Sequence, residues 1–186
     1  MIRLDIKHTS CGTSEGEILS LRAAAESANT LLHTGEGAGN DFLGWVNLPS
    51  SITAEEITAI KATAARLAKK AEVIIVIGIG GSYLGAKAVL DAMSSSFHFL
   101  HKERKNPYIV FAGNNLSETY TAELLEATKE YSIAAIVISK SGTTTEPAVA
   151  FRLIKAEIEA RYGKEEAKVR IASVTDAARG ALKTLS

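Results

Sequence analysis

The sequence has 186 residues, of which 46% are hydrophobic and 23% are charged, and its 21 basic and 21 acidic residues give zero formal charge. This length and composition are typical of one well-packed globular domain with some additional structure. Zero net charge argues against a nucleic-acid-binding protein, because binding to a polymer of phosphates requires clustered basic residues.

The N-terminal stretch MIRLDIKHTS lacks the apolar core of a secretory signal, and Cys11 is the only cysteine, so no intrachain disulfide can form. Residues 15–34 have apolar positions at helical spacing and end at a glycine-rich run. Thr53 precedes a run with acidic residues at its start and basic residues at its end, which predicts a helix over 53–71. We expect a cytoplasmic protein whose leading segment packs on the core.

Short apolar runs separated by helical stretches follow. The predicted strands are 73–79, 108–112, 134–138 and 169–174, and the predicted helices between them are 82–94, 117–130 and 144–162. Three of the runs are continuous rather than alternating, as expected for strands that helices cover on both faces. The pattern predicts a parallel α/β sheet. The longest apolar run is too short to span a bilayer, so we expect no membrane partner.

The loop after the first predicted strand, residues 78–85, reads GIGGSYLG. Glycines let a backbone turn sharply and approach a ligand, and Ser82 can cap the next helix or donate its hydroxyl to a ligand. The same glycines also suit a tight turn that serves only helix packing. From this loop alone, a ligand site and a packing turn are equally supported.

The loop after the third predicted strand, residues 139–147, reads SKSGTTTEP and carries five hydroxyl groups in its first seven residues. Hydroxyls and backbone N–H groups at a helix start can surround a phosphate monoester with little net positive charge. The alternative is an elaborate helix cap in which Glu146 interacts with the helix start. Five hydroxyls exceed what a cap needs, so the sequence favours an anion-binding loop.

Three other kinds of site do not fit the sequence of these loops. A dinucleotide fingerprint needs glycine where Tyr83 stands, and the second strand ends in asparagines rather than in a ribose-binding acid. In a nucleotide phosphate loop lysine follows glycine directly, but Ala86 separates Gly85 from Lys87. No G-x-S-x-G elbow marks a serine nucleophile.

The runs IGIGGSYLG at 77–85 and VISKSGTTTEP at 137–147 resemble bacterial phosphoglucose isomerases in sequence, order and separation. The similarity extends through 41–45, 112–115 and 173–183. The resemblance implies a flavodoxin-like three-layer α/β sandwich, the first sugar isomerase (SIS) domain, preceded by an N-terminal helical segment. It sets the segment at 1–50 and the SIS domain at 51–186, truncated at its C-terminal end.

The resemblance also implies site residues, with no cofactor and no metal. Gly81 and Ser82 would line the sugar-phosphate pocket. The phosphate of glucose 6-phosphate or fructose 6-phosphate would bind to Ser139, Lys140, Ser141, Thr143 and Thr144. The main hydroxyl donors in that group would be Ser139, Ser141 and Thr144.

In the family, isomerisation proceeds by ring opening and proton transfer between C1 and C2 through an enediol. The resemblance places the glutamate base, the histidine and lysine of ring opening and a Gly-Gly-Arg arginine downstream of this sequence. It therefore implies an N-terminal fragment that is inactive alone and a homodimer for the full-length enzyme. Two alternatives stay open: a phosphosugar-binding SIS module without catalysis, and a complete small isomerase whose base is Glu146 or comes from a partner chain.

Overall fold

The computed structural model describes residues 8, 12–100 and 105–185, and the chain divides into two compact units, Met1–Ile57 and Thr58–Ser186. Cys11 and most of the N-terminal stretch lie outside the described residues. The domain boundary at residue 50 and the packing of the leading segment on the core stay predictions. None of the described helices is both long enough and apolar enough to cross a membrane.

The first unit contains short helices joined by turns. Its elements are α1 (Glu15–Ser20), α2 (Arg22–Thr34), η1 (Asn40–Phe42) and α3 (Leu48–Ser51). The sequence predicts one helix over 15–34, but the structure breaks it at Leu21. Just before the break, the hydroxyl of Ser20 donates to the carbonyl of Glu17 at 2.7 Å. Such a bond to the preceding turn competes with the helical backbone, and hydrophobic periodicity does not register it.

The second unit holds the sheet. Its elements are α4 (Ala54–Lys70), which begins in the first unit, β1 (Val73–Ile77), α5 (Gly81–Met93), η2 (His98–Leu100), β2 (Tyr108–Ala112), α6 (Glu118–Ala127), β3 (Ile133–Ile138), α7 (Thr145–Arg170), β4 (Ile171–Val174) and α8 (Ala181–Leu185). All four predicted strands are present, and the helix predicted over 53–71 is confirmed with Thr53 as its cap: its hydroxyl accepts the N–H of Glu56 at 3.1 Å.

The four strands form one sheet in the order β2-β1-β3-β4, and every pair is parallel. The register aligns Ile77 of β1 with Ala112 of β2 and with Val137 of β3. This order matches the first four strands of flavodoxin-like folds. The predicted parallel α/β architecture is therefore confirmed.

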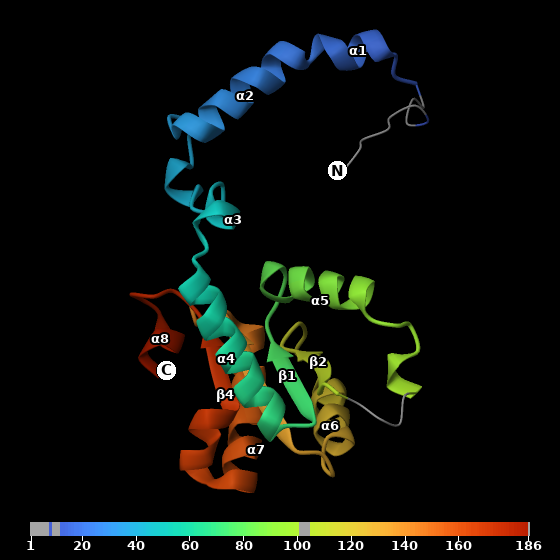
Figure 1. The fold of residues 1–186 in the computed structure, drawn as a ribbon, viewed down its shortest axis with the longest axis vertical. Helices are drawn as coiled ribbons and strands as arrows, with labels where there is room; N and C mark the ends of the chain where they lie inside the picture. The colour runs from blue at the N-terminus through green and yellow to red at the C-terminus, as the bar shows by residue number, and fades with distance from the viewer. Residues whose placement is uncertain (1–7, 9–11, 101–104, 186) are drawn as a thin grey trace. The chain divides into compact units, whose positions relative to one another are not determined.

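Helices cover both faces of the sheet (Figure 1). On one face, side chains of β1 and β3 pack with Ile154 and Ile158 of α7, which are fully buried, and with Leu124 of α6. On the other face, Leu67 of α4 packs against the sheet, and Tyr83 of α5 meets Phe111 of β2 with ring centroids 5.6 Å apart. All five residues of β1 are buried, which explains why that strand is continuously apolar.

The end of α7 differs from the sequence-based prediction. The sequence predicts a stop near residue 162 with Gly163 as the cap, and Gly163 does interrupt the helix, with φ 79° and ψ 160°. A further helical stretch then continues to Arg170, so β4 starts at Ile171 rather than at residue 169. Side chains of this stretch bond to α4 and β3, and these tertiary contacts are absent from a local pattern.

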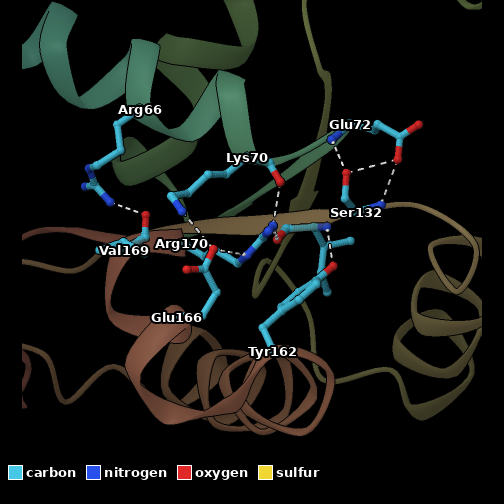
Figure 2. Close-up of polar contacts among 9 residues, drawn as sticks. Arg66, Lys70, Glu72, Ser132, Tyr162, Glu166, Val169 and Arg170 are labelled. Atoms are coloured by element: carbon cyan, nitrogen blue, oxygen red, sulfur yellow. Dashed lines mark hydrogen bonds and ion pairs between the residues drawn. The ribbon is translucent and has the colours of Figure 1, made fainter.

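Those contacts form a polar network at the amino ends of the strands (Figure 2). Glu166 pairs with Lys70 at 2.8 Å and with Arg170 at 3.0 Å, and the Arg170 guanidinium lies 3.8 Å from the centre of the Tyr162 ring. Arg170 also donates to the carbonyls of Lys70 and Ile133. The network therefore ties the C-terminal ends of α4 and α7 to the start of β3.

The network makes stability depend on pH through Glu166. The hydrogen bond from Lys70, together with the charges of Lys70 and Arg170, lowers the pKa of Glu166 below its usual 4.5. The unfolded chain therefore binds this proton more tightly than the folded chain, so the stabilisation is complete above the unfolded pKa and is lost as pH falls through the folded value.

We expect Glu166→Gln to flatten the fall of melting temperature between about pH 5 and pH 3, because the variant carries no titrating carboxyl at this position. Thermal unfolding followed by circular dichroism across that range measures the effect. Glu165→Gln, on the same helix and 85% exposed, is the matched control and should retain the wild-type slope. Parallel pH profiles for Glu166→Gln and wild type would contradict the assignment.

Candidate functional site

The two loops singled out by the sequence lie at one edge of the sheet. They follow β1 and β3, which are neighbouring parallel strands aligned from Val73 with Ile133 to Ile77 with Val137. In the strand order, β2, which follows β1 through α5, lies on one side of the central pair β1 and β3. β4, which follows β3 through α7, lies on the opposite side of that pair. The pair β1 and β3 is thus the topological switch point, where open α/β sheets bind ligands.

The first loop turns sharply from β1 into α5. Gly80 is the N-cap with φ 56° and ψ −128°, a conformation that favours glycine, and no side chain caps the helix. Of the two roles that the sequence leaves open for Ser82, capping α5 is not the one it takes, because Ser82 lies within the first turn. Gly78 is buried, and a Cβ there would lie 3.2 Å from the Cβ of Ser82, so this glycine serves packing.

Gly81 and Gly85 do not serve packing in the same way. A Cβ added at either position would meet no atom within 4 Å. Among the described residues, no packing contact therefore accounts for these two glycines, in contrast to Gly78. Open space beside the backbone of Gly81 leaves room for the close approach of a ligand.

The second loop, residues 139–147, is called the hydroxyl-rich loop below, and its own hydroxyls hold its conformation. Ser139 is 6% exposed, and its Oγ accepts the N–H of Gly142 at 3.0 Å. The Oγ of Ser141 accepts the N–H of Thr143 at 3.2 Å and lies 3.0 Å from its Oγ1. Each serine oxygen is thus engaged within the loop, while its hydroxyl hydrogen can still donate to an anion.

The helix-cap interpretation of this loop is not supported. Thr144 is the N-cap of α7, yet its side chain makes no capping hydrogen bond, and the exposed hydroxyl stays available. Within the described ranges no hydrogen bond links the Glu146 side chain to the helix start. The N–H groups of the first helical turn have no intrahelical acceptor, so this end of α7 presents donors to the edge of the sheet.

The segment after β4 lies against the second loop, and the sequence did not identify this support. The N–H of Ser139 donates to the carbonyl of Val174, the last residue of β4, at 3.0 Å. Beyond β4, the N–H of Ala181 donates to the carbonyl of Ser141 at 3.3 Å. The N–H groups of Ala178 and Arg179 bond to Asp176 at 2.8 Å and 2.9 Å.

These hydrogen bonds lower the pKa of Asp176, and the positive charges of Arg179 and Lys140 add to the effect. The carboxylate of Asp176 is therefore held in its charged form beside the only cation of the second loop. A signal for this segment was present in the sequence, because it follows a parallel strand and so must emerge at the edge that carries both loops.

A third strand end contributes to the same edge. Gly113 follows β2 with φ 74°, and a Cβ there would lie 2.9 Å from the Cα of Pro147 in α7. Only glycine fits this position without moving the start of α7. Gly113 therefore fixes where the hydroxyl-rich loop enters its helix. In the described part of the chain no three His, Cys, Asp or Glu side chains come together to hold a metal ion.

No protein-family model matches the chain. It is 51% identical over 185 residues to the glucose-6-phosphate isomerase of Parabacteroides distasonis and 48% identical over 187 residues to that of Clostridium novyi. Each alignment covers 100% of this chain but 41% and 42% of the respective relative.

Among solved structures, a hypothetical protein of Thermus thermophilus superposes with a TM-score of 0.69. It is 24% identical, and the match covers 91% of this chain and 38% of that protein, which supports the flavodoxin-like fold alone. The sequence identity to the two isomerases, in contrast, is high enough to indicate a common ancestor as well as a common fold. Over its whole length, the chain is therefore a relative of the glucose-6-phosphate isomerases and spans about two fifths of the length of those compared.

Proposed function

We propose that this chain binds the phosphate group of a phosphosugar between its β1 and β3 loops, as the phosphosugar-binding part of a glucose-6-phosphate isomerase. One observation carries the proposal: the hydroxyl-rich loop sits at the switch point of the sheet while its N-cap hydroxyl, Thr144, caps nothing. A loop that existed to cap α7 would use that hydroxyl.

The phosphate would be bound mainly by neutral donors. Ser139, Ser141 and Thr144 offer hydroxyl hydrogens, α7 offers the positive end of its dipole, and Lys140 adds a charge. The Thr143 hydroxyl, which donates to the Ser141 oxygen at 3.0 Å in this structure, would turn toward the anion. Gly81 and Ser82, across the switch point, would contact the sugar. Donors fixed by the loop's internal bonds need little reorganisation when the anion arrives, which favours affinity without a large positive field.

The isomerisation is proposed for a protein that comprises this chain and the further length that its relatives have. The chain would form the first SIS domain, and the interconversion of glucose 6-phosphate and fructose 6-phosphate through an enediol would use residues outside it. We place this enzyme in the cytoplasm and propose a homodimer. A phosphosugar-binding module without catalysis is the second candidate, since the binding site described above would serve it equally.

Titration calorimetry of the 186-residue chain tests the binding proposal. We expect fructose 6-phosphate and glucose 6-phosphate to bind, inorganic phosphate to bind more weakly, and fructose to bind undetectably, because the phosphate supplies most of the hydrogen bonds. Equal affinity for fructose and its 6-phosphate would overturn the assignment of the loop to phosphate.

An isomerase assay of the same preparation separates the proposed roles of the chain. We expect no conversion of fructose 6-phosphate above the buffer rate, because the described site offers hydroxyls and one lysine but no histidine. Conversion that Glu146→Gln abolishes would instead identify a complete small isomerase, with Glu146 as its base.

A further inference from the structure

The stretch after β4, which runs from Thr175 into the start of α8, interlocks with the backbone of the hydroxyl-rich loop. A Cβ on Gly142 would lie 2.2 Å from the backbone nitrogen of Leu182, and a Cβ on Gly180 would lie 2.7 Å from the carbonyl oxygen of Ser141. Both glycines have positive φ, 69° and 105°. The two backbones therefore approach each other more closely than any residue with a side chain allows.

Hydrogen bonds add to this contact. The N–H of Ala181 reaches the carbonyl of Ser141 at 3.3 Å, and the Oγ1 of Thr175 reaches the carbonyl of Lys140 at 3.4 Å. Leu182, 4% exposed, anchors the segment in the core that α7 and the sheet form. The position of the loop is thus coupled to the position of a buried side chain.

The loop also borders open space. Ser139 and Gly142 line a cavity of about 400 Å³, together with residues of α7 and α8, among them Phe151, Ala181 and Leu182. This space gives the loop room to shift if the contact with Gly180 and Ala181 is lost. The interlock with the segment after β4 is what opposes such a shift.

Asp176 shapes the segment itself. Its carboxylate accepts the N–H groups of Ala178 and Arg179, which closes a turn immediately before Gly180. The turn directs Gly180 and Ala181 back toward Ser141. No other described side chain accepts a hydrogen bond from these N–H groups, so the turn depends on an acceptor at position 176.

We propose that residues 175–182 form a clamp that holds the hydroxyl-rich loop in its phosphate-binding conformation, with Asp176 and Gly180 as positioning residues. The clamp touches no phosphate itself. It sets the backbone of Lys140, Ser141 and Gly142 so that the hydroxyls converge on one anion. The inference rests on the proposed function for its consequence on affinity, but the clamp's effect on loop conformation is independent of it.

Gly180→Ala tests the clamp against a matched glycine. Gly163 also has positive φ, 79°, but a Cβ there would meet nothing within 4 Å, and it lies in the kink of α7, next to the Tyr162 that bonds to the start of β3. Both variants carry the same kind of backbone strain. We expect Gly180→Ala to weaken fructose 6-phosphate binding about tenfold or more, the equivalent of one lost charge-assisted hydrogen bond, and Gly163→Ala to change it less than about twofold.

Asp176 is tested with two substitutions. Asp176→Asn keeps an oxygen acceptor for the two N–H groups, whereas Asp176→Ala removes it. We expect the asparagine variant to keep the wild-type affinity within about threefold and the alanine variant to lose about tenfold, if the turn and not the charge positions the loop. Equal losses in both variants would overturn the role of the turn.

A ligand-free readout separates the clamp from the proposed function. In ¹⁵N–¹H spectra without phosphosugar, Gly180→Ala should move the amide signals of Ser141, Gly142 and Thr143 and speed hydrogen exchange at Gly142, while Gly163→Ala leaves them in place. Unmoved signals would overturn the clamp whether or not the wild type binds. Moved signals in a chain that binds no phosphosugar would support the clamp and reject the proposed function.

Discussion

Replacing Ser139, Ser141 and Thr144 together with alanine should weaken fructose 6-phosphate binding by about a thousandfold or more. Hydrogen bonds to a charged partner contribute roughly 1.5–3 kcal/mol each, and every 1.4 kcal/mol corresponds to about tenfold in affinity. Calorimetry on the triple variant measures the loss. Thr121→Ala is the control, since the Thr121 hydroxyl donates to the carbonyl of Ser117 in the preceding turn of its own helix.

The three single alanine variants should differ in whether they change only the affinity or also the stability of the loop. The oxygens of Ser139 and Ser141 accept loop N–H groups, so alanine at either position both removes a donor and loosens the loop. Thr144 makes no capping bond, so Thr144→Ala should lower affinity and leave the melting temperature unchanged, while Thr144→Ser restores binding. If the triple variant binds fructose 6-phosphate as tightly as the wild type, these three hydroxyls do not contribute to phosphate binding.

Arg170→Ala should cost the second unit about 2–4 kcal/mol of unfolding free energy, because it removes a mostly buried cation that bonds to two carbonyls and to Glu166. Its side chain is 12% exposed and lies over the Tyr162 ring, so packing is lost as well. Urea unfolding monitored by circular dichroism provides the measurement.

Lys168→Ala is the matched control for Arg170→Ala. Lys168 lies on the same helix and, among the described residues, pairs with Glu165 alone, with both side chains largely exposed, 68% and 85%. Surface pairs of this kind contribute about 0–1 kcal/mol. Similar losses in the two variants would show that the polar network at the amino ends of the strands does not stabilise the fold.

The sheet was predictable from the sequence because burial on both faces leaves a continuous apolar run. The run at 73–77 is buried throughout, and the run at 108–112 coincides with β2. The order of the strands was not predicted, since no local pattern records which strands pair. The extension of α7 to Arg170 escaped prediction for a related reason: its partners Lys70 and Ile133 are distant in sequence.

The site was predictable in its location but not in its internal bonding. Parallel strands carry both loops to one edge, so the composition of residues 78–85 and 139–147 sufficed to place a candidate site there. Only the folded structure shows whether Thr144 caps α7 and whether Gly81 packs against a neighbour. The contribution of Asp176 and Gly180 also required the structure, because only backbone proximity links them to Ser141.

The most direct measurement is a titration of the ¹⁵N-labelled 186-residue chain with fructose 6-phosphate, with fructose as the reference ligand, followed amide by amide. We predict saturable shifts, specific to the phosphorylated sugar, in two groups of amides that follow β1 and β3: Gly81 and Ser82, and residues 140–146. Shifts confined to other parts of the sheet edge, or equal shifts with fructose, would contradict a phosphosugar site between these loops.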